Sequence, residues 1–218
     1  MRTLALFLLV VLAQIAAAQD KFRVGMIGLT HGHASGFLRN FLAHPDLDLV
    51  GISEPDKALA SQYATRYKID PARLFNSHAE MLDKTKPEAV MIFTSTYEHK
   101  DLVELCALRK IHVMMEKPLA VSMAHARAME AAAKRSGIHV LVNYETTWYP
   151  VNEPIWRLVH DEKKLGEIRR IVTHYGHQGP KEIGVGPEFF NWLTDPVKNG
   201  AGALFDFGCY GAHFATWL

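Results

Sequence analysis

The sequence predicts an α/β protein with a doubly wound parallel sheet, followed by the beginning of an α+β second domain. Three observations favour this fold: short apolar runs alternate with amphipathic stretches, the runs are apolar throughout, and the alternation stops after Asn143. Strands that are buried on both faces are continuously apolar, and helices between such strands connect parallel neighbours.

Six strands and five intervening helices are expected in order from Lys21. The apolar runs that predict strands span residues 22–28, 47–53, 74–75, 89–94, 112–115 and 139–143. The amphipathic stretches that predict helices span residues 34–44, 57–67, 77–82, 98–109 and 122–136. Pro55 and Asp56 favour a helix start before residue 57, because both residue types suit the beginning of a helix.

The chain becomes richer in Trp, Tyr, Pro and Gly after Asn143. We expect a helix over 152–159, a strand over 167–175, a loop over 176–187 and a helix from Asp206 to the last residue. This last helix has no C-cap glycine or polar tail, which predicts that the chain is truncated within its second domain.

The first eighteen residues have the pattern of a secretory signal peptide. Arg2 precedes an apolar run, and three alanines at 16–18 form a small-residue cleavage site. We therefore expect a signal peptide over 1–18, a dinucleotide-binding domain over 19–143 and a partial substrate domain over 144–218. Export to the periplasm or the extracellular space follows. The apolar run is shorter than the ~20 residues of a membrane helix, so no stable membrane insertion is expected unless the segment stays uncleaved.

The charge balance argues against nucleic acid as a partner. The chain has 24 Lys and Arg against 23 Asp and Glu, and loss of Arg2 with the signal peptide leaves 23 of each. A neutral chain lacks the basic surface that neutralises phosphates. A composition of 49% hydrophobic and 22% charged residues is that of a globular protein. Cys106 and Cys209 are too few to form a disulfide framework, and we expect buried thiols.

The loop after the first strand resembles a dinucleotide-binding loop with two of its three glycines replaced. Gly28 fits the tight turn of G-x-G-x-x-G, whereas Thr30 and His33 stand at the second and third glycine positions. Backbone N–H groups at the following helix start can still hold a diphosphate. The loop residues expected to contact the cofactor are Gly28, Thr30, His31, Gly32 and His33. Taken alone, the loop fits an ordinary tight turn equally well.

Glu54 ends the second strand, 26 residues after Gly28. This is near the ~20-residue offset at which an acidic residue meets the adenosine ribose. A carboxylate there favours NAD over NADP, although Lys57 or Arg66 can soften its repulsion of a 2′-phosphate. The alternative is a solvated acid at a helix N-terminus, where negative charge is favourable.

Three motifs in order resemble the Gfo/Idh/MocA oxidoreductase family. Residues 116–118 read E-K-P, and residues 89–99 are similar to the family's strand, loop and histidine-bearing helix start. Residues 200–210 resemble its glycine-rich D-x-G-x-H element, with Asp206 in place and Tyr210 where the family has histidine. The resemblance covers the chain from Lys21 onward and implies a Rossmann-type domain that binds NAD or NADP.

The resemblance also implies roles for individual residues. Glu116 would accept hydrogen bonds from the nicotinamide ribose, and Lys117 would donate to the reacting oxygen of the substrate. Asp206 would orient Lys117 and favour its charged state. The other cofactor contacts that the resemblance implies are Thr94, Ser95, Thr96 and His99.

Two departures from the family pattern affect proton transfer and substrate contacts. A phenol with a pKa of ~10 cannot act as the base that an imidazole with a pKa of ~6.5 can, so Tyr210 is expected to act together with Lys117. His213 is a competing candidate, and a structural histidine there is equally plausible. The family's N-R-R-F segment is replaced by Glu145 to Trp148, which removes two arginines.

Pairs of histidines suggest a metal site, but their surroundings do not support one. His31 with His33 and His174 with His177 are the closest pairs. Neither has a cysteine or an acidic pair at zinc-site spacing, and the first lies in the expected diphosphate loop. No metal ligand is therefore expected.

These observations favour an exported oxidoreductase that passes a hydride between nicotinamide and a carbinol carbon of a sugar, inositol or related polyol. We expect it to form a homo-oligomer at full length. One alternative is an NAD-dependent glycosidase of the same family, which regenerates its cofactor. The other is a non-catalytic nucleotide- or sugar-sensing protein, suggested by the altered loop and the lost histidine and arginines.

Overall fold

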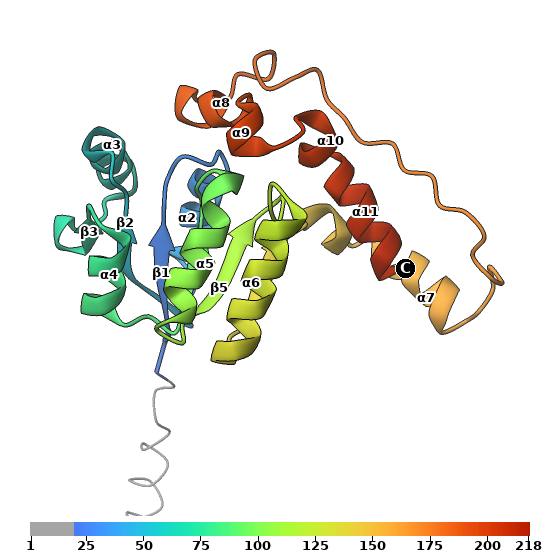
Figure 1. Ribbon diagram of the computed structural model, residues 1–218, viewed down its shortest axis with the longest axis horizontal. Helices are drawn as coiled ribbons and strands as arrows, with labels where there is room; N and C mark the ends of the chain where they lie inside the picture. The colour runs from blue at the N-terminus through green and yellow to red at the C-terminus, as the bar shows by residue number, and fades with distance from the viewer. Residues whose placement is uncertain (1–19) are drawn as a thin grey trace, which may run out of the picture.

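The computed structural model describes residues 20–218, so the expected signal peptide lies outside the described residues. Its centre is a six-stranded parallel sheet in the order β3-β2-β1-β4-β5-β6 (Figure 1). The strands are β1 (Phe22–Ile27), β2 (Leu47–Ser53), β3 (Leu74–Phe75), β4 (Ala89–Ile92), β5 (His112–Glu116) and β6 (Val140–Asn143). This is the strand order of a Rossmann-type sheet, and the predicted fold class is confirmed.

Helices cover the sheet on both faces. They are α2 (Ala34–Phe41), α3 (Lys57–Tyr67), α4 (His78–Thr85), α5 (His99–Ala107) and α6 (Met123–Ser136). One buried cluster joins α2 and α3 to the sheet around Leu38 and Ile52, and a second joins α4, α5 and α6 around Ile92 and Met129. Apolar burial on both faces explains why the strands are apolar throughout.

Local sequence signals set the ends of these helices. The Asp56 side chain accepts hydrogen bonds from two backbone N–H groups in the first turn of α3, and Ser122 caps α6 in the same way. Gly137 ends α6 with a φ of 70°, a conformation that glycine adopts without strain. Short 3-10 helices occur at η1 (Pro71–Arg73), η2 (Thr96–Glu98) and η3 (Glu145–Trp148).

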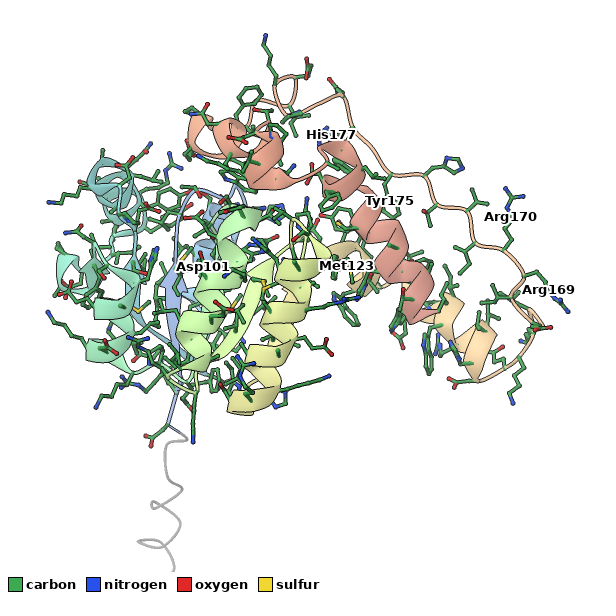
Figure 2. The ribbon with its side chains drawn as sticks, viewed as in Figure 1. Asp101, Met123, Arg169, Arg170, Tyr175 and His177 are labelled. Carbon is green, nitrogen blue, oxygen red and sulfur yellow. The ribbon has the colours of Figure 1, made fainter. Side chains whose placement is uncertain are left out.

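The chain after β6 is helical and irregular. Its helices are α7 (Asn152–His160), α8 (Pro187–Leu193), α9 (Pro196–Asn199), α10 (Ala203–Asp206) and α11 (Gly208–Trp217). The predicted strand over 167–175 is wrong, since this segment is an extended, largely exposed connection (Figure 1). Arg169 and Arg170 project from it away from the other elements (Figure 2). A strand needs a hydrogen-bonded neighbour, and the described chain forms no strand after β6 that could supply one.

Other differences in this region are smaller. The final helix, predicted as continuous from Asp206, is divided at Phe207, whose φ of −110° departs from the helical value. Cys106 is buried as predicted, whereas Cys209 is partly exposed. Among the described residues, no helix combines the length and apolar character that a membrane crossing requires.

Candidate functional site

A cavity of about 790 Å³ lies at the carboxyl ends of the strands, between the first loop and the α10–α11 region. Ligands of open α/β sheets bind at this edge. The predicted site residues that line the cavity are His31, Gly32, His33, Lys117, Asp206 and Tyr210. Tyr175 and His177 reach it from the extended connection (Figure 2). The structure thus brings the predicted catalytic residues and part of the predicted cofactor loop to one space.

Gly28 makes the tight turn that begins the first loop. Its φ is +78°, and a Cβ there would lie 3.0 Å from the carbonyl oxygen of Phe93 and would also collide with the side chain of Thr94. Both the backbone conformation and the space therefore require glycine.

We expect Gly28→Ala to lower the free energy of unfolding by more than about 1 kcal/mol, because alanine is strained at positive φ. Gly137→Ala is the matched control, since Gly137 has a φ of +70° with nothing within 4 Å of the added Cβ. Urea unfolding of both variants should give the larger loss for Gly28→Ala. Equal losses would mean that the contact with Phe93 and Thr94 is unimportant.

Helix α8 packs on the first loop, which the sequence did not reveal. The ring of Phe189 lies 4.6 Å from that of His31, centroid to centroid, and Trp192 Nε1 donates to the Thr30 carbonyl oxygen at 3.4 Å. The backbone N–H of His31 donates to the backbone carbonyl oxygen of Phe93 at 3.0 Å. Burial lowers the pKa of His31 to about 3, so this ring is neutral and part of the packed interior.

Glu54 is buried at the end of β2 and contacts the first loop. Its carboxylate accepts hydrogen bonds from the N–H of Leu29 at 2.8 Å and of Asp56 at 2.9 Å. Burial raises the pKa of this carboxyl group, although the two N–H donors oppose the shift. Glu54 therefore fixes the loop to the strand end, a structural role that the sequence did not predict.

The other predicted cofactor residues lie at the carboxyl end of β4 and are buried rather than on the cavity surface. They are Thr94, Ser95, Thr96 and His99. His99 Nδ1 contacts the carbonyl oxygen of Leu119 at 3.2 Å, and its Nε2 and the Thr96 hydroxyl have no hydrogen-bond partner among the described residues. Buried polar atoms without partners are unusual in proteins. These residues therefore lie beneath the ligand edge of the sheet and do not reach the cavity.

Lys117 and Asp206 form a buried ion pair between β5 and α10. The Lys117 ammonium group contacts the Asp206 carboxylate and also donates to the backbone carbonyl oxygen of Asp206 at 3.2 Å. The ammonium nitrogen also lies 5.7 Å and 5.2 Å from the ring centroids of Phe207 and Tyr210. Aromatic faces attract such a cation, so the charged lysine is held at the cavity wall.

Tyr210 and His213 differ in their relation to the cavity. Burial raises the pKa of the Tyr210 phenol above its ordinary value of 10, so this group is protonated at neutral pH. His213 does not line the cavity. Its Nδ1 lies 2.8 Å from the Thr147 hydroxyl, and its ring stacks on Tyr144 at 4.3 Å.

Glu116 joins the two loop histidines into a cluster that the sequence did not predict. Its Oε2 lies 3.1 Å from His33 Nδ1 and 3.9 Å from His31 Nε2, and the three donor atoms lie within 4.8 Å of one another. However, His31 Nδ1 accepts the N–H of His33 at 3.1 Å. The neutral ring then carries its proton on Nε2, the reverse of what a metal-ligating nitrogen needs. Neither His33 Nδ1 nor Glu116 Oε2 has a hydrogen-bond partner among the described residues.

Comparison with known families agrees with this geometry. Residues 22–144 match the Gfo/Idh/MocA oxidoreductase family with its NAD-binding Rossmann fold, and residues 156–218 match the GFO/IDH/MocA C-terminal domain. The chain belongs to the Gfo/Idh/MocA family. The resemblance inferred from the three motifs is confirmed.

Curated relatives are about a quarter identical to the chain over the residues that align. Trans-1,2-dihydrobenzene-1,2-diol dehydrogenase from Xenopus laevis is 25% identical over 79% of this chain and 49% of its own length. D-apiose dehydrogenase from Paraburkholderia graminis is 29% identical over 69% of this chain and 40% of its own length. The chain thus spans about half the length, or less, of these curated relatives.

Several solved structures have a fold similar to that of the chain. Aldose-aldose oxidoreductase from Caulobacter crescentus, complexed with glycerol, has a TM-score of 0.76 at 25% identity and covers 91% of this chain and 58% of its own. An inositol dehydrogenase homolog from Azotobacter vinelandii, complexed with NAD+, has a TM-score of 0.76 at 20% identity. The match covers 91% of this chain and 53% of the homolog.

Proposed function

We propose that the protein is an NAD-dependent oxidoreductase that transfers a hydride between nicotinamide and a carbinol carbon of a sugar, inositol or related polyol. The observation that carries the proposal is the buried Lys117–Asp206 pair, which shares one cavity with the first loop of an NAD-binding fold. The names of the relatives, dehydrogenases of diols and sugars, support this class of substrate.

Different residues bind the cofactor and position the reacting groups in the proposed reaction. The Gly28 turn and the first turn of α2 hold the diphosphate. When bound, the nicotinamide supplies or accepts the hydride. The Lys117 ammonium group donates a hydrogen bond to the reacting oxygen and stabilises negative charge on it, while Asp206 and the rings of Phe207 and Tyr210 fix its position.

Turnover distinguishes this function from its two alternatives. Net NADH accumulation with a polyol is expected for an oxidoreductase, whereas a glycosidase would cleave its sugar with no net NADH. A sensing protein would bind nucleotide without turnover. The packing of Phe189 and Trp192 on the first loop favours that last alternative, because it fills space near the expected diphosphate.

Glu54 predicts the nucleotide preference. NAD(H) should bind at least about tenfold more tightly than NADP(H), roughly 1.4 kcal/mol, because a 2′-phosphate would face the Glu54 carboxylate. Calorimetric titration of both nucleotides measures the ratio. Arg66→Ala should widen the preference, since Arg66 lines the cavity and can pair with a phosphate. A tenfold preference for NADPH would contradict the placement of Glu54.

Export and self-association are also proposals: the first rests on the sequence and the second on exposed apolar side chains. The pattern over residues 1–18 supports a signal peptide. Exposed apolar side chains after β6, including Trp148 and Leu204, support an interface with further protein surface.

A further inference from the structure

Glu145 places a carboxylate without a basic partner in the wall of the cavity. It is the first residue of η3 and is half-buried. Its Oε1 accepts a hydrogen bond from the hydroxyl of Tyr149 at 3.3 Å, and this donor is neutral. No lysine, arginine or histidine of residues 20–218 forms an ion pair with Glu145. A partly buried charge of this kind favours a ligand that brings a positive charge.

The other charged side chains of the cavity balance one another. Lys117 contacts the Asp206 carboxylate in a buried pair. Burial raises the pKa of the Tyr63 phenol, and the charges of Glu188 and Arg66 act on it with opposite signs, so both of these side chains lie near Tyr63. Each of the two positions therefore holds one charge of each sign, and the carboxylate of η3 is the charge that is left over.

The three histidines of the cavity do not compensate Glu145. Burial lowers the pKa of His31 to about 3, so this ring is neutral. His33 Nδ1 lies 3.1 Å from Glu116 Oε2, so a positive charge on His33 is balanced by that carboxylate. His177 lies on the extended connection, where its Nδ1 accepts a backbone N–H at 2.9 Å. The cavity is therefore negative next to η3.

Three tyrosine rings lie near this carboxylate, and all three line the cavity: Tyr149, Tyr175 and Tyr210. Glu145 is the largest cause of the raised pKa of Tyr149, and for Tyr210 it is the next cause after burial, so its carboxylate lies near both phenols. The rings of Tyr175 and Tyr210 are 5.7 Å apart, centroid to centroid. The Tyr210 ring centroid also lies 5.2 Å from the Lys117 nitrogen, so the carboxylate and the rings are next to the proposed reacting centre.

Two of these rings are accessible to a ligand. Tyr149 is 49% exposed and Tyr175 is 40% exposed, and Tyr175 reaches the cavity from the extended connection (Figure 2). The face of an aromatic ring attracts a cation within about 6 Å of its centroid. A carboxylate next to accessible tyrosine rings is therefore suited to an organic ammonium group.

We propose that the substrate of this site is an amino sugar or an amino polyol, whose ammonium group binds Glu145 and the rings of Tyr149 and Tyr175. The inference rests on the proposed function and names the class of polyol within it. The ammonium group is bound and not changed, because the hydride leaves a different carbon, which is held near Lys117. Sugars that carry a carboxylate or a phosphate are disfavoured, because their charge would face the unpaired carboxylate.

A neutral hydroxyl group can also donate to Glu145, so the test varies the charge on a constant carbon skeleton. The probes are glucitol, 1-amino-1-deoxyglucitol and gluconate, which are neutral, positive and negative at neutral pH. Methyl glucoside, methyl glucosaminide and methyl glucuronide repeat the comparison in a ring. Each probe is titrated by calorimetry into full-length protein loaded with NAD. The amino probe of each set should bind at least about tenfold more tightly than the neutral one, and the anionic probe should bind more weakly than the neutral one.

Substitutions assign this preference to the proposed residues. Glu145→Gln keeps the size of the side chain and removes its charge, and it should reduce the preference for the amino probe to less than about threefold. Tyr175→Leu should reduce the preference in part. Glu188→Gln is the matched control, because Glu188 is a second carboxylate that lines the same cavity, and it should keep the wild-type preference. Unchanged affinity for NAD in each variant shows that it is folded.

The outcomes separate this inference from the proposed function. Equal binding of the neutral and amino probes, tighter binding of the anionic probe, or no binding of any probe would overturn the ammonium site and leave the oxidoreductase in place. A preference that survives Glu145→Gln, or that Glu188→Gln removes to the same extent, would also overturn it. A preference that depends on Glu145, in a protein that binds NAD and oxidises no sugar or polyol, would support the ammonium site and overturn the proposed function.

Discussion

Asp206→Leu should cost about 3–5 kcal/mol of folding free energy, because it leaves a buried lysine charge without its partner. Lys117 is 6% exposed, and the side chains of the pair are 7% and 12% exposed. Lys117→Met should cost a similar amount for the same reason. The double variant should be more stable than either single variant, since two apolar side chains replace the pair without an uncompensated charge.

Urea unfolding of the wild type, the two single variants and the double variant measures the free energy of this double-mutant cycle. The exposed pair Lys134–Glu130, at 2.6 Å on one face of α6, is the matched control. Glu130→Gln should have little effect, because exposed ion pairs are screened by solvent. Additive losses for Lys117 and Asp206 would mean that the two charges do not stabilise each other.

Lys117→Met should also lower kcat by at least about 100-fold, the effect expected of a group that acts on the reacting oxygen. The affinity for NAD should stay nearly intact, because the contacts proposed for the dinucleotide come from other residues. Comparison of kcat with the calorimetric dissociation constant of NAD separates the two effects. Lys117→Arg keeps the charge, but its planar group cannot take the position between Asp206 and the two rings.

A parallel loss of kcat and nucleotide affinity in Lys117→Met would assign the residue to cofactor binding. Unchanged turnover would remove it from the reaction and strengthen the sensing alternative.

The sequence predicted the sheet because its signals are local. The apolar runs and the helix start at Pro55 and Asp56 each act within a few residues, and such signals give the order of strands and helices. The prediction of a strand over 167–175 was wrong because a strand needs a hydrogen-bonded neighbouring strand, and no local pattern in the sequence reveals whether one is present.

The site was predicted in part, for the same reason. The family resemblance singled out Lys117, Asp206 and Tyr210, and the structure brings them together. The contact of Glu116 with His33, however, joins the end of β5 to the first loop, and no spacing in the sequence signals it. Likewise, no local pattern in the sequence indicates that Phe189 and Trp192 pack on that loop.

In the proposed reaction, a hydride passes from a carbinol carbon of the substrate to nicotinamide. Full-length protein is incubated with NAD and a panel of sugars and polyols deuterated at their carbinol carbons, and the nucleotide is examined by mass spectrometry. We expect NADH that carries one deuterium to accumulate, and we expect this product to be lost in Lys117→Met. Bound NAD that gains no deuterium from any member of the panel would contradict the proposed reaction.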